Sequence, residues 1–248
     1  MPDSTCAKNL TVVVPTYNEE ATLSTVMERV LAQPMVGEVI IVDDGSHDDT
    51  KKIAEEWAGK EPRVRFLIHE ENRGKGAALR TGFQAAKLPF VLVQDADMEY
   101  DPEDYAKVMA PLLADEADVV YGSRYLKKDT RRVMRFWHTT GNRVLTTASN
   151  MFSDLYVTDM ETCYKCFRRE VIQAIPLEEE RFGFEPEVTA KLARMKLRVM
   201  ETSIHYYPRG YDEGKKIGWK DGVRALWCIF RFNLLDREVY HWERADED

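Results

Sequence analysis

The first half of the 248-residue chain alternates short apolar runs with longer segments of helical periodicity. The runs that are rich in β-branched residues are LTVVVP, EVIIVDD, VRFLIHE, FVLVQDAD and ADVVYGSR. Helix-like segments separate them, the first from Glu19 to Leu31 and the second from about Thr50 to Trp57. Continuous apolar strands that alternate with helices are typical of a parallel sheet covered on both faces. We therefore predict an α/β fold, with helices on both faces of a mostly parallel central sheet.

The second half of the chain has a weaker periodicity. We expect a helix around Gly141–Phe152, a strand around Thr162–Phe167, a helix from about Pro186 to Met195 and a strand within LRVMETSIHYYP. No internal repeat, low-complexity segment or linker is visible in the sequence, so we predict one domain over residues 1–248. The last six residues of the sequence form the acidic segment ERADED.

Polar residues follow three of the expected strands at the point where each ends. Pro15–Glu19 follows the first strand, Asp43–Ser46 the second and Asp95–Asp97 the fourth. The carboxyl ends of parallel strands meet at one edge of a sheet, and α/β sheets bind their ligands there. We expect these three loops to form one site.

The fourth strand leads into four carboxylates, those of Asp95, Asp97, Glu99 and Asp101. They would repel one another unless a positive group lies among them. Hard cations such as Mg2+ and Mn2+ prefer oxygen ligands and leave positions for water and substrate phosphate. The pattern predicts a divalent metal ion that bridges the protein to a diphosphate. A solvated acidic loop is the alternative for the Asp-Ala-Asp motif taken alone.

Two further segments are candidates for ligand binding. Asp43-Asp44-Gly45-Ser46 offers acceptors for a base N–H or a ribose hydroxyl, although a helix N-cap and turn fits it equally well. Two glycines flank Lys75 just before a helix, where the backbone can approach a ligand and the ammonium can meet phosphate. Neither GxxxxGK[ST] nor a strand followed by GxGxxG is present, which disfavours nucleotide-hydrolase and dinucleotide-binding functions.

Charge and cysteine content exclude some classes of protein. A net charge of -8 argues against a general nucleic-acid binder. Basic residues still gather locally, at Arg131, Arg132, Arg135 and Arg143. Four scattered cysteines favour a reducing compartment over a disulfide scaffold. The Cys163-Tyr-Lys-Cys166 pair is weak evidence for zinc, and alternation within a strand explains it better.

The sequence shows no signal peptide and no apolar run of the roughly 20 residues that span a bilayer. The segment VRALWCIFRFNLL is apolar almost all round, and it is either a buried helix or one that lies on a lipid surface. Packing or a partner surface is favoured over membrane contact, because the acidic tail would oppose an anionic bilayer. We expect a cytoplasmic protein and leave peripheral contact with the cytoplasmic membrane face open.

Six blocks of sequence occur together: VVVPTYNEE, EVIIVDDGSHDDT, NRGKGAALRTGF, QDADMEYDPED, VVYGSRY and DMETCYKCFRREV. In this order and spacing they resemble glycosyltransferase family 2, within its dolichol-phosphate mannosyltransferase-like branch, over about residues 10–235. The resemblance implies a GT-A fold, a nucleotide-diphosphate sugar donor, a Mg2+ or Mn2+ ion and inversion at the anomeric carbon. It divides the chain into a nucleotide-sugar half at about 10–125 and an acceptor half at about 126–235, followed by the tail at 236–248.

The resemblance also implies roles for single residues. Contacts to the nucleotide carry over to Pro15, Tyr17, Glu19, Val42 and Asp44. Metal and donor binding carry over to Asp95, Ala96, Asp97 and Glu99, the last at a position where relatives often carry glutamine. Contacts to donor or acceptor phosphate carry over to Arg124 and Arg135, since the planar guanidinium can hold two phosphate oxygens at once.

The acceptor decides whether a base is needed. A hydroxyl acceptor requires a carboxylate to take its proton, and Glu185 and Glu187 are the candidates, although acids at a helix start fit them equally. A lipid phosphate is already anionic and requires none. Arg209 and Lys215 lie in a glycine-containing segment that could close over the diphosphate or hold an acceptor phosphate. His205 is more typical of a structural residue than of a metal ligand.

The leading hypothesis is a metal-dependent inverting glycosyltransferase. It would move a hexose from a donor of the GDP-mannose or UDP-glucose type to a polyprenyl phosphate such as dolichyl or undecaprenyl phosphate, with Asp97 and Arg124 at the reacting groups. One alternative keeps the donor and uses a soluble sugar or small hydroxyl acceptor. A second alternative is a non-catalytic protein that binds sugar nucleotides.

Overall fold

The computed structural model describes residues 8–126, 132–208, 219–236, 238 and 242. Its strands are β1 (Leu10–Thr16), β2 (Val36–Asp43), β3 (Val64–Ile68), β4 (Phe90–Val93), β5 (Val119–Ser123), β6 (Lys165–Arg168) and β7 (Val199–Ser203). Its α-helices are α1 (Leu23–Leu31), α2 (Thr50–Lys60), α3 (Lys75–Ala85), α4 (Tyr105–Leu113), α5 (Phe136–Ser153), α6 (Arg169–Ala174), α7 (Phe184–Arg194) and α8 (Trp219–Phe230). A 3-10 turn at Pro102–Asp104 precedes α4, and a π-helical turn at Arg231–Leu235 follows α8.

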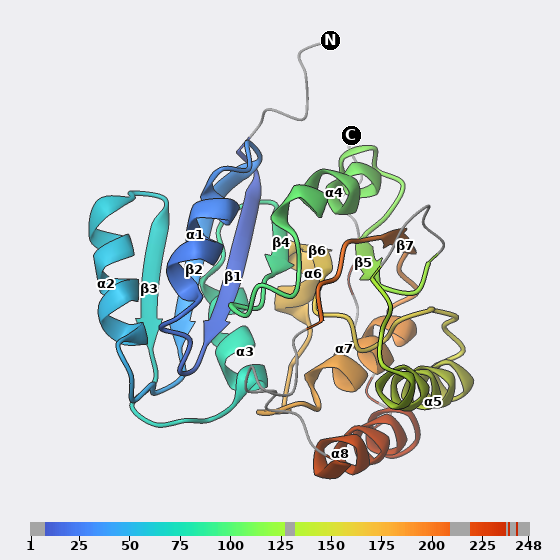
Figure 1. Cartoon of the computed structure of the whole chain (residues 1–248). Coiled ribbons are helices and arrows are strands. Elements are labelled where there is room, and N and C mark those ends of the chain that lie inside the picture. The colour runs from blue at the N-terminus through green and yellow to red at the C-terminus, as the bar shows by residue number, and fades with distance from the viewer. Residues whose placement is uncertain (1–7, 127–131, 209–218, 237, 239–241, 243–248) are drawn as a thin grey trace.

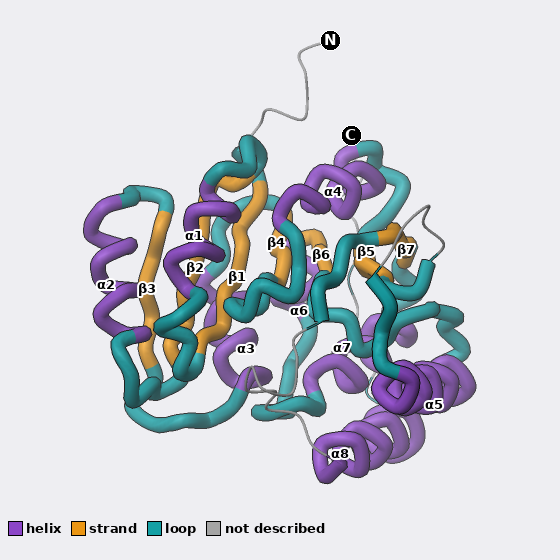
Figure 2. Tube along the Cα trace, viewed as in Figure 1, coloured by secondary structure: helices purple, strands orange, loops and turns teal. Residues whose placement is uncertain are grey.

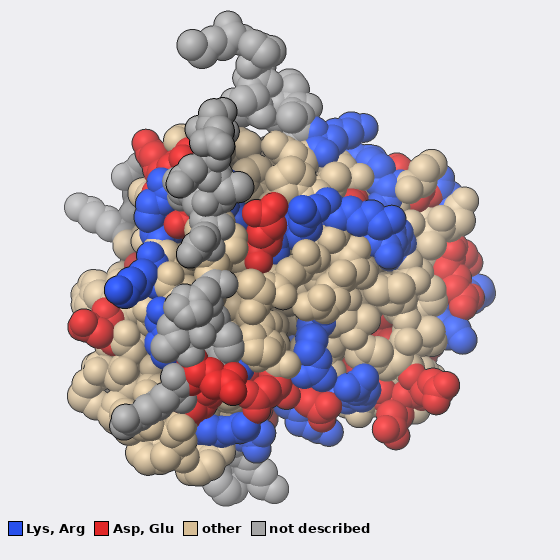
Figure 3. Space-filling view, turned by 180° about the vertical axis from the view of Figure 1, so that it is seen from behind, with Lys and Arg blue, Asp and Glu red and all other residues tan. Residues whose placement is uncertain are grey.

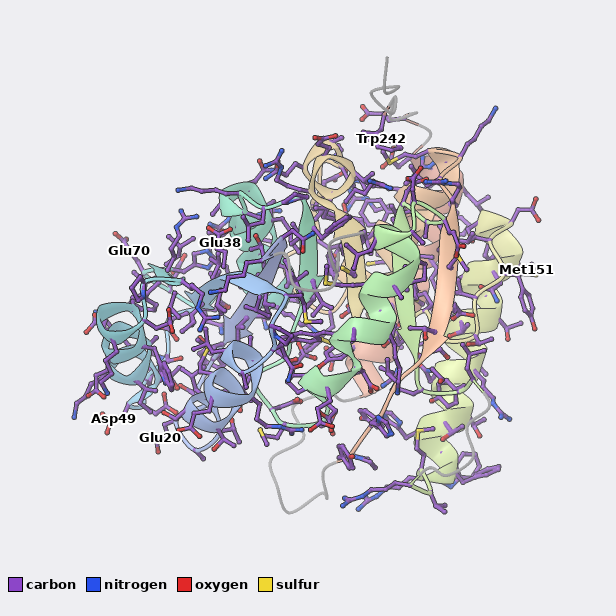
Figure 4. All side chains as sticks on the ribbon, turned by 90° about the horizontal axis from the view of Figure 1, so that it is seen from above. Glu20, Glu38, Asp49, Glu70, Met151 and Trp242 are labelled. Carbon is purple, nitrogen blue, oxygen red and sulfur yellow. The ribbon has the colours of Figure 1, made fainter. Side chains whose placement is uncertain are left out.

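The described strands form one seven-stranded sheet in the order β3-β2-β1-β4-β6-β5-β7, with helices on both sides (Figures 1 and 4). Every pair in it is parallel except the two made by β6. The expected α/β class with a mostly parallel sheet is therefore confirmed. The antiparallel insertion of β6 between β4 and β5 was not expected from the sequence.

The position of β1 fixes where a ligand can bind. β1 pairs with β2 on one side and with β4 on the other, so the chain reverses its direction of winding there. The loops that follow β1, β2 and β4 therefore meet at one edge of the sheet, the lower edge in Figures 1 and 2. This confirms the expectation that the three polar loops converge, because such a reversal is where α/β sheets open a binding crevice.

Helix α1 begins at Leu23, four residues later than the apolar periodicity indicated. The reason is that the preceding residues bond to the loop after β2. The amide of Glu19 donates to Oγ1 of Thr50 at 2.8 Å, and the Glu20 carboxylate accepts the amide of Asp49 at 2.9 Å. Figure 4 shows Glu20 and Asp49 in the same region of the structure. Two of the three site loops are thus joined directly.

The second half of the chain departs further from the expected boundaries. Strand β6 begins at Lys165 rather than at Thr162, because the residues before it bond outside the strand ladder. Oγ1 of Thr162 donates to the carbonyl of Gly122, and the amide of Cys163 donates to the hydroxyl of Tyr100 at 3.0 Å. Helix α5 begins at residue 136, ahead of the expected Gly141, and α7 lies within two residues of its expected start.

Over the part of the chain that is described, no helix has both the length and the apolar character that a bilayer crossing requires. Seen from behind, basic and acidic side chains are interspersed over the surface (Figure 3).

Helix α3 lies close against β1, and Gly82 makes this possible. A Cβ at that position would fall well inside van der Waals contact with the side chain of Val13, which is fully buried in β1. In helix α2, a Cβ at Gly59 would meet open space. Both glycines lie in a helix and have the same intrinsic helix propensity, but only Gly82 is packed against a neighbouring strand.

We predict that Gly82→Ala lowers the free energy of unfolding by about 1–3 kcal/mol, because it forces β1 and α3 apart. Gly59→Ala is the control and should raise that free energy by up to about 1 kcal/mol, since alanine favours the helix. Urea unfolding of both variants measures the difference. Equal effects of the two substitutions would show that α3 does not pack on β1 as described.

Candidate active site

Asp44 is buried at the end of β2, where its carboxylate organises the loop before α3. Nδ1 of His69 lies 2.7 Å from Oδ1, and the amides of Arg73 and Gly74 donate to the two oxygens at 3.1 and 2.6 Å. Gly74 has a φ of 106°, which favours glycine, and this conformation carries its amide to the carboxylate. Asp44 therefore holds in place the loop that ends at Lys75.

Lys75 begins α3 and joins two other parts of the site. Its Nζ lies 2.9 Å from Oδ1 of Asp95, after β4, and 3.2 Å from Oε1 of Glu185, at the start of α7. Burial alone would lower the pKa of the Lys75 ammonium, but the charges of Asp95 and Glu185 hold that pKa well above its usual value. Lys75 is thus a permanent cation at the carboxyl edge of the sheet.

The four acids after β4 have different partners. Lys75 pairs with Asp95, and Arg29 pairs with Asp101 at 2.5 Å. The sequence predicted a positive group among these carboxylates. Lys75 and Arg29 provide part of that positive charge. Oδ1 of Asp97 accepts the amide of Glu99 at 3.2 Å, and Oε2 of Glu99 accepts the hydroxyl of a tyrosine, Tyr206, at 2.8 Å.

The loop that carries Asp97 and Glu99 has an unusual backbone. Met98 between them has a φ of 62°, and Asn18 in the loop after β1 has a φ of 53°. Left-handed conformations of such residues concentrate at functional sites. Within the described residues, no three His, Cys, Asp or Glu side chains gather where a metal ion could lie. A cation held here would need substrate oxygens as further ligands, which is the usual arrangement for Mg2+.

Arg124 has a buried carboxylate partner that the sequence analysis did not identify. Its Nε and Nη2 each lie 2.7 Å from an oxygen of Asp159, and its own amide donates to Oδ2 at 3.0 Å. Burial raises the pKa of Asp159, yet Arg124 outweighs it and the net pKa is lowered. The guanidinium also lies 5.1 Å from the ring of Tyr206, whose hydroxyl bonds to Glu99. The Arg124–Asp159 pair is thus linked to the Glu99 loop through Tyr206.

Glu187 makes contacts that hold backbone in place. Its carboxylate accepts the amides of Glu178 and Glu179 at 2.7 and 2.8 Å and pairs with Lys191 at 2.7 Å. Burial raises the pKa of Glu187 although Lys191 and the two amides act against it. Of the two candidate bases, Glu187 secures the segment before α7, and Glu185 is the one that meets Lys75.

The remaining candidates from the sequence lie as follows. Pro15 and Val42 are register partners in the buried strands β1 and β2, and Ala96 is buried after β4. The ring of Tyr17 lies 6.4 Å from that of His47, and Glu19 accepts the hydroxyl of Thr22 at 3.1 Å.

The remaining candidates have other surroundings or lie outside the described residues. His205 bonds to Asp104 at 3.0 Å, as a structural histidine would. Arg135 is exposed at the start of α5. Cys163 and Cys166 are both buried, and only Cys166 lies in β6. Arg209 and Lys215 fall outside the described residues.

Residues 11–175 match glycosyl transferase family 2. The chain belongs to this family. It is 28% identical over 218 residues to undecaprenyl-phosphate 4-deoxy-4-formamido-L-arabinose transferase of Aeromonas hydrophila, covering 86% of this chain and 64% of that one. It is 31% identical over 215 residues to polyprenol monophosphomannose synthase of Mycolicibacterium smegmatis, covering 84% and 80%. The expectation of a glycosyltransferase is thereby confirmed at the level of the family.

The fold also has close counterparts among solved structures. Glucosyl-3-phosphoglycerate synthase of Mycobacterium tuberculosis, in complex with Mn2+, UDP and glucosyl-3-phosphoglycerate, superimposes with a TM-score of 0.70 at 20% identity. The match covers 93% of this chain and 81% of that one. At this identity the likeness concerns the fold, and it confirms the GT-A fold expected from the sequence.

We predict that Asp159→Asn lowers the free energy of unfolding by about 3–5 kcal/mol, because it leaves the buried guanidinium of Arg124 without a compensating charge. Asp115→Asn is the control, since that carboxylate is 60% exposed in its ion pair with Arg198 and should cost at most about 1 kcal/mol. Urea unfolding compares the two variants. An Asp159→Asn cost as small as that of the control would mean that the pair contributes nothing to the fold.

Proposed function

We propose that this protein transfers a hexose from a nucleotide-diphosphate sugar to a polyprenyl phosphate, with help from a divalent cation. The observation that carries the proposal is the convergence of Asp44, the Lys75–Asp95 pair and Asp97 at the carboxyl edge of a GT-A sheet. Relatives whose names specify undecaprenyl phosphate or polyprenol support this class of acceptor. We further propose one domain, with a donor half at about 10–125 and an acceptor half at about 126–235.

The donor half has the parts that a nucleotide diphosphate requires. We propose that the nucleoside lies against the ends of β1 and β2, with contacts from Pro15, Tyr17, Glu19 and Val42. Asp44 orders the loop before α3, and Lys75 provides a fixed positive charge beside Asp95. A fixed cation at this position attracts the diphosphate and needs no rearrangement when negative charge develops on it.

The donor set at the end of β4 fits a hard cation. Asp97 and Glu99 would hold the ion, with Asp95 next to it, and all three offer only oxygen. When bound, the ion would neutralise charge on the departing diphosphate. The solved relative with Mn2+ and UDP supports this choice of ions. Mg2+ and Mn2+ are both compatible with these ligands.

The acceptor half is better suited to an anionic nucleophile than to a hydroxyl. A phosphate oxygen needs no base, and both candidate bases are already paired with lysines, Glu185 with Lys75 and Glu187 with Lys191. We propose that Glu185 positions Lys75. Arg135, Arg209 and Lys215 are proposed to meet the acceptor or donor phosphate. Arg124 is proposed to act through Asp159 and Tyr206, by supporting the Glu99 loop.

We also propose that α5 and α8 face a membrane that holds the lipid acceptor. The two helices pack against each other at one corner of the molecule (Figure 1), and Met151 of α5 lies at its outer edge (Figure 4). Trp137 is 80% exposed and Trp227 is 48% exposed. Further exposed apolar residues on these two helices are Phe136, Val144, Val223, Leu226 and Phe230. Arg143 of α5 and Arg224 of α8 are also exposed, and aromatic groups beside arginines suit an anionic lipid surface. This proposal departs from the expectation from the sequence, which favoured packing or a partner surface for the segment that forms α8.

We predict that transfer to a short polyprenyl phosphate requires Mg2+ or Mn2+ and that Asp97→Asn lowers kcat by about 100-fold or more, because a cation ligand is lost. Asp101→Asn is the matched control on the same loop and should keep its turnover, since Asp101 binds Arg29. Transfer assays with a panel of UDP- and GDP-sugars, with and without lipid phosphate, measure the metal requirement and the turnover of each variant. Full turnover in EDTA, or in Asp97→Asn, would rule out the metal site. Donor hydrolysis without lipid product would point to a hydroxyl acceptor.

We predict that the double variant Trp137→Glu/Trp227→Glu binds vesicles of mixed neutral and anionic phospholipid about 10-fold more weakly, because it places charge on the apolar face. Ile68→Glu is the control. Ile68 is 46% exposed on β3, at the far end of the sheet from α5 and α8 (Figure 1). Sedimentation with vesicles at low and high salt gives the readout. Equal vesicle binding by wild type, the double variant and Ile68→Glu would show that α5 and α8 do not form the membrane-binding face.

A further inference from the structure

Glu161 has a carboxyl group for which the described protein provides no partner. It lies in the segment between α5 and β6, two residues after Asp159 and four before Lys165. Its Oε1 is buried and accepts no hydrogen bond, while the residue as a whole keeps some exposure. Buried polar groups in folded proteins are nearly always bonded, so an exception requires a physical explanation.

Three other buried or half-buried glutamates of the described chain have hydrogen-bond partners. Glu187 accepts two amides and pairs with Lys191, and Glu179 accepts the guanidinium of Arg224 at 2.8 and 2.9 Å. Glu201 accepts both the amide and the hydroxyl of Thr158, at 2.9 and 3.0 Å. The fold thus supplies partners to carboxylates that serve structure, and it supplies none to Glu161.

The cations around Glu161 are already occupied. Lys165 donates to the carbonyls of Met160 and Thr162, and Arg124 is held by Asp159. Lys75, the cation that pairs with Glu185, is held by Asp95 and by Glu185 itself. The charges of Glu185, Lys165, Arg124 and Asp159 all act on Glu161, but Glu161 forms an ion pair with none of the described residues.

The same surroundings favour a neutral carboxyl group. Burial and the charge of Glu185 raise the pKa of Glu161 to about 8, while Lys165 and Arg124 act in the opposite direction. A protonated carboxyl both donates and accepts hydrogen bonds. This combination matches a hydroxyl group, which also does both.

We propose that Glu161 binds hydroxyl groups of the sugar that is transferred. The inference rests on the proposed function and extends it to sugar recognition. Asp95, which follows β4 and would lie near the diphosphate, pairs with Lys75, and Lys75 pairs with Glu185. The charge of Glu185 acts in turn on Glu161. The nearby carboxylates of Glu185 and Asp159 disfavour an anionic group at this point, whereas an uncharged sugar is compatible with them. A site built to bond a hydroxyl also discriminates against sugars that lack it.

The test compares Glu161→Met, which keeps the length and removes the polar atoms, with Glu161→Gln, which keeps a donor and an acceptor. Binding of UDP, GDP and the matching sugar nucleotides is measured with Mn2+ by calorimetry, together with the melting temperature. Glu161→Met should weaken sugar-nucleotide binding about 10-fold or more relative to the nucleotide alone. Glu161→Gln should stay within about 3-fold of wild type. The melting temperature of Glu161→Met should be unchanged or higher, because a buried unbonded group is removed.

Glu201→Met is the matched control, since Glu201 is half-buried like Glu161 and its carboxyl group does have partners in the fold. It should lower the melting temperature and leave the ratio of sugar-nucleotide to nucleotide affinity unchanged. If Glu161→Met behaves like this control, Glu161 is structural and the inference fails, while the proposed function stands. If wild type binds no sugar nucleotide at all, the proposed function itself fails and the inference with it.

Discussion

The ammonium of Lys75 is the contact on which the arrangement of the site depends. Lys75 is the first residue of α3, and its ammonium group pairs with Asp95 from the loop after β4 and with Glu185 from the start of α7. Three elements that are far apart in sequence are therefore held at one point on the carboxyl edge of the sheet. Because both partners are carboxylates in a largely buried setting, removing the cation would leave them to repel each other.

The segment before α7 extends this arrangement to the proposed membrane side. The carbonyl of Glu180 accepts the amide of Ala77 in α3 at 3.0 Å, and Glu187 accepts the amides of Glu178 and Glu179. The side chain of Glu179 in turn binds Arg224 of α8. The helix whose apolar face is exposed is thus connected, through one short segment, to the loop that carries Lys75.

The parts of this fold that the sequence predicts are those with a local cause. Continuous apolar runs specified the parallel strands, and the strand-end loops followed from them. The course of β6 was not predictable, because its neighbours β4 and β5 provide its partners from distant parts of the chain. The same holds for Asp159 and Arg124, since neither residue type reveals a buried pair. Only the DMETCYK block gave a signal that this segment matters.

The hydrogen-bond and ion-pair partners of the buried carboxyl groups distinguish those that stabilise the fold from those that are candidates for ligand binding. Asp44 and Glu187 appear in the sequence as acids with binding potential, yet the fold uses them to hold amides and a lysine. Asp159, which the sequence did not single out, holds an arginine. Glu161 appears unremarkable in the sequence and lacks any such use. Among the described residues, a carboxyl oxygen that is buried without a hydrogen bond, as Oε1 of Glu161 is, costs the fold stability. That loss is intelligible if substrate supplies the missing hydrogen bonds, because binding then recovers what folding alone does not.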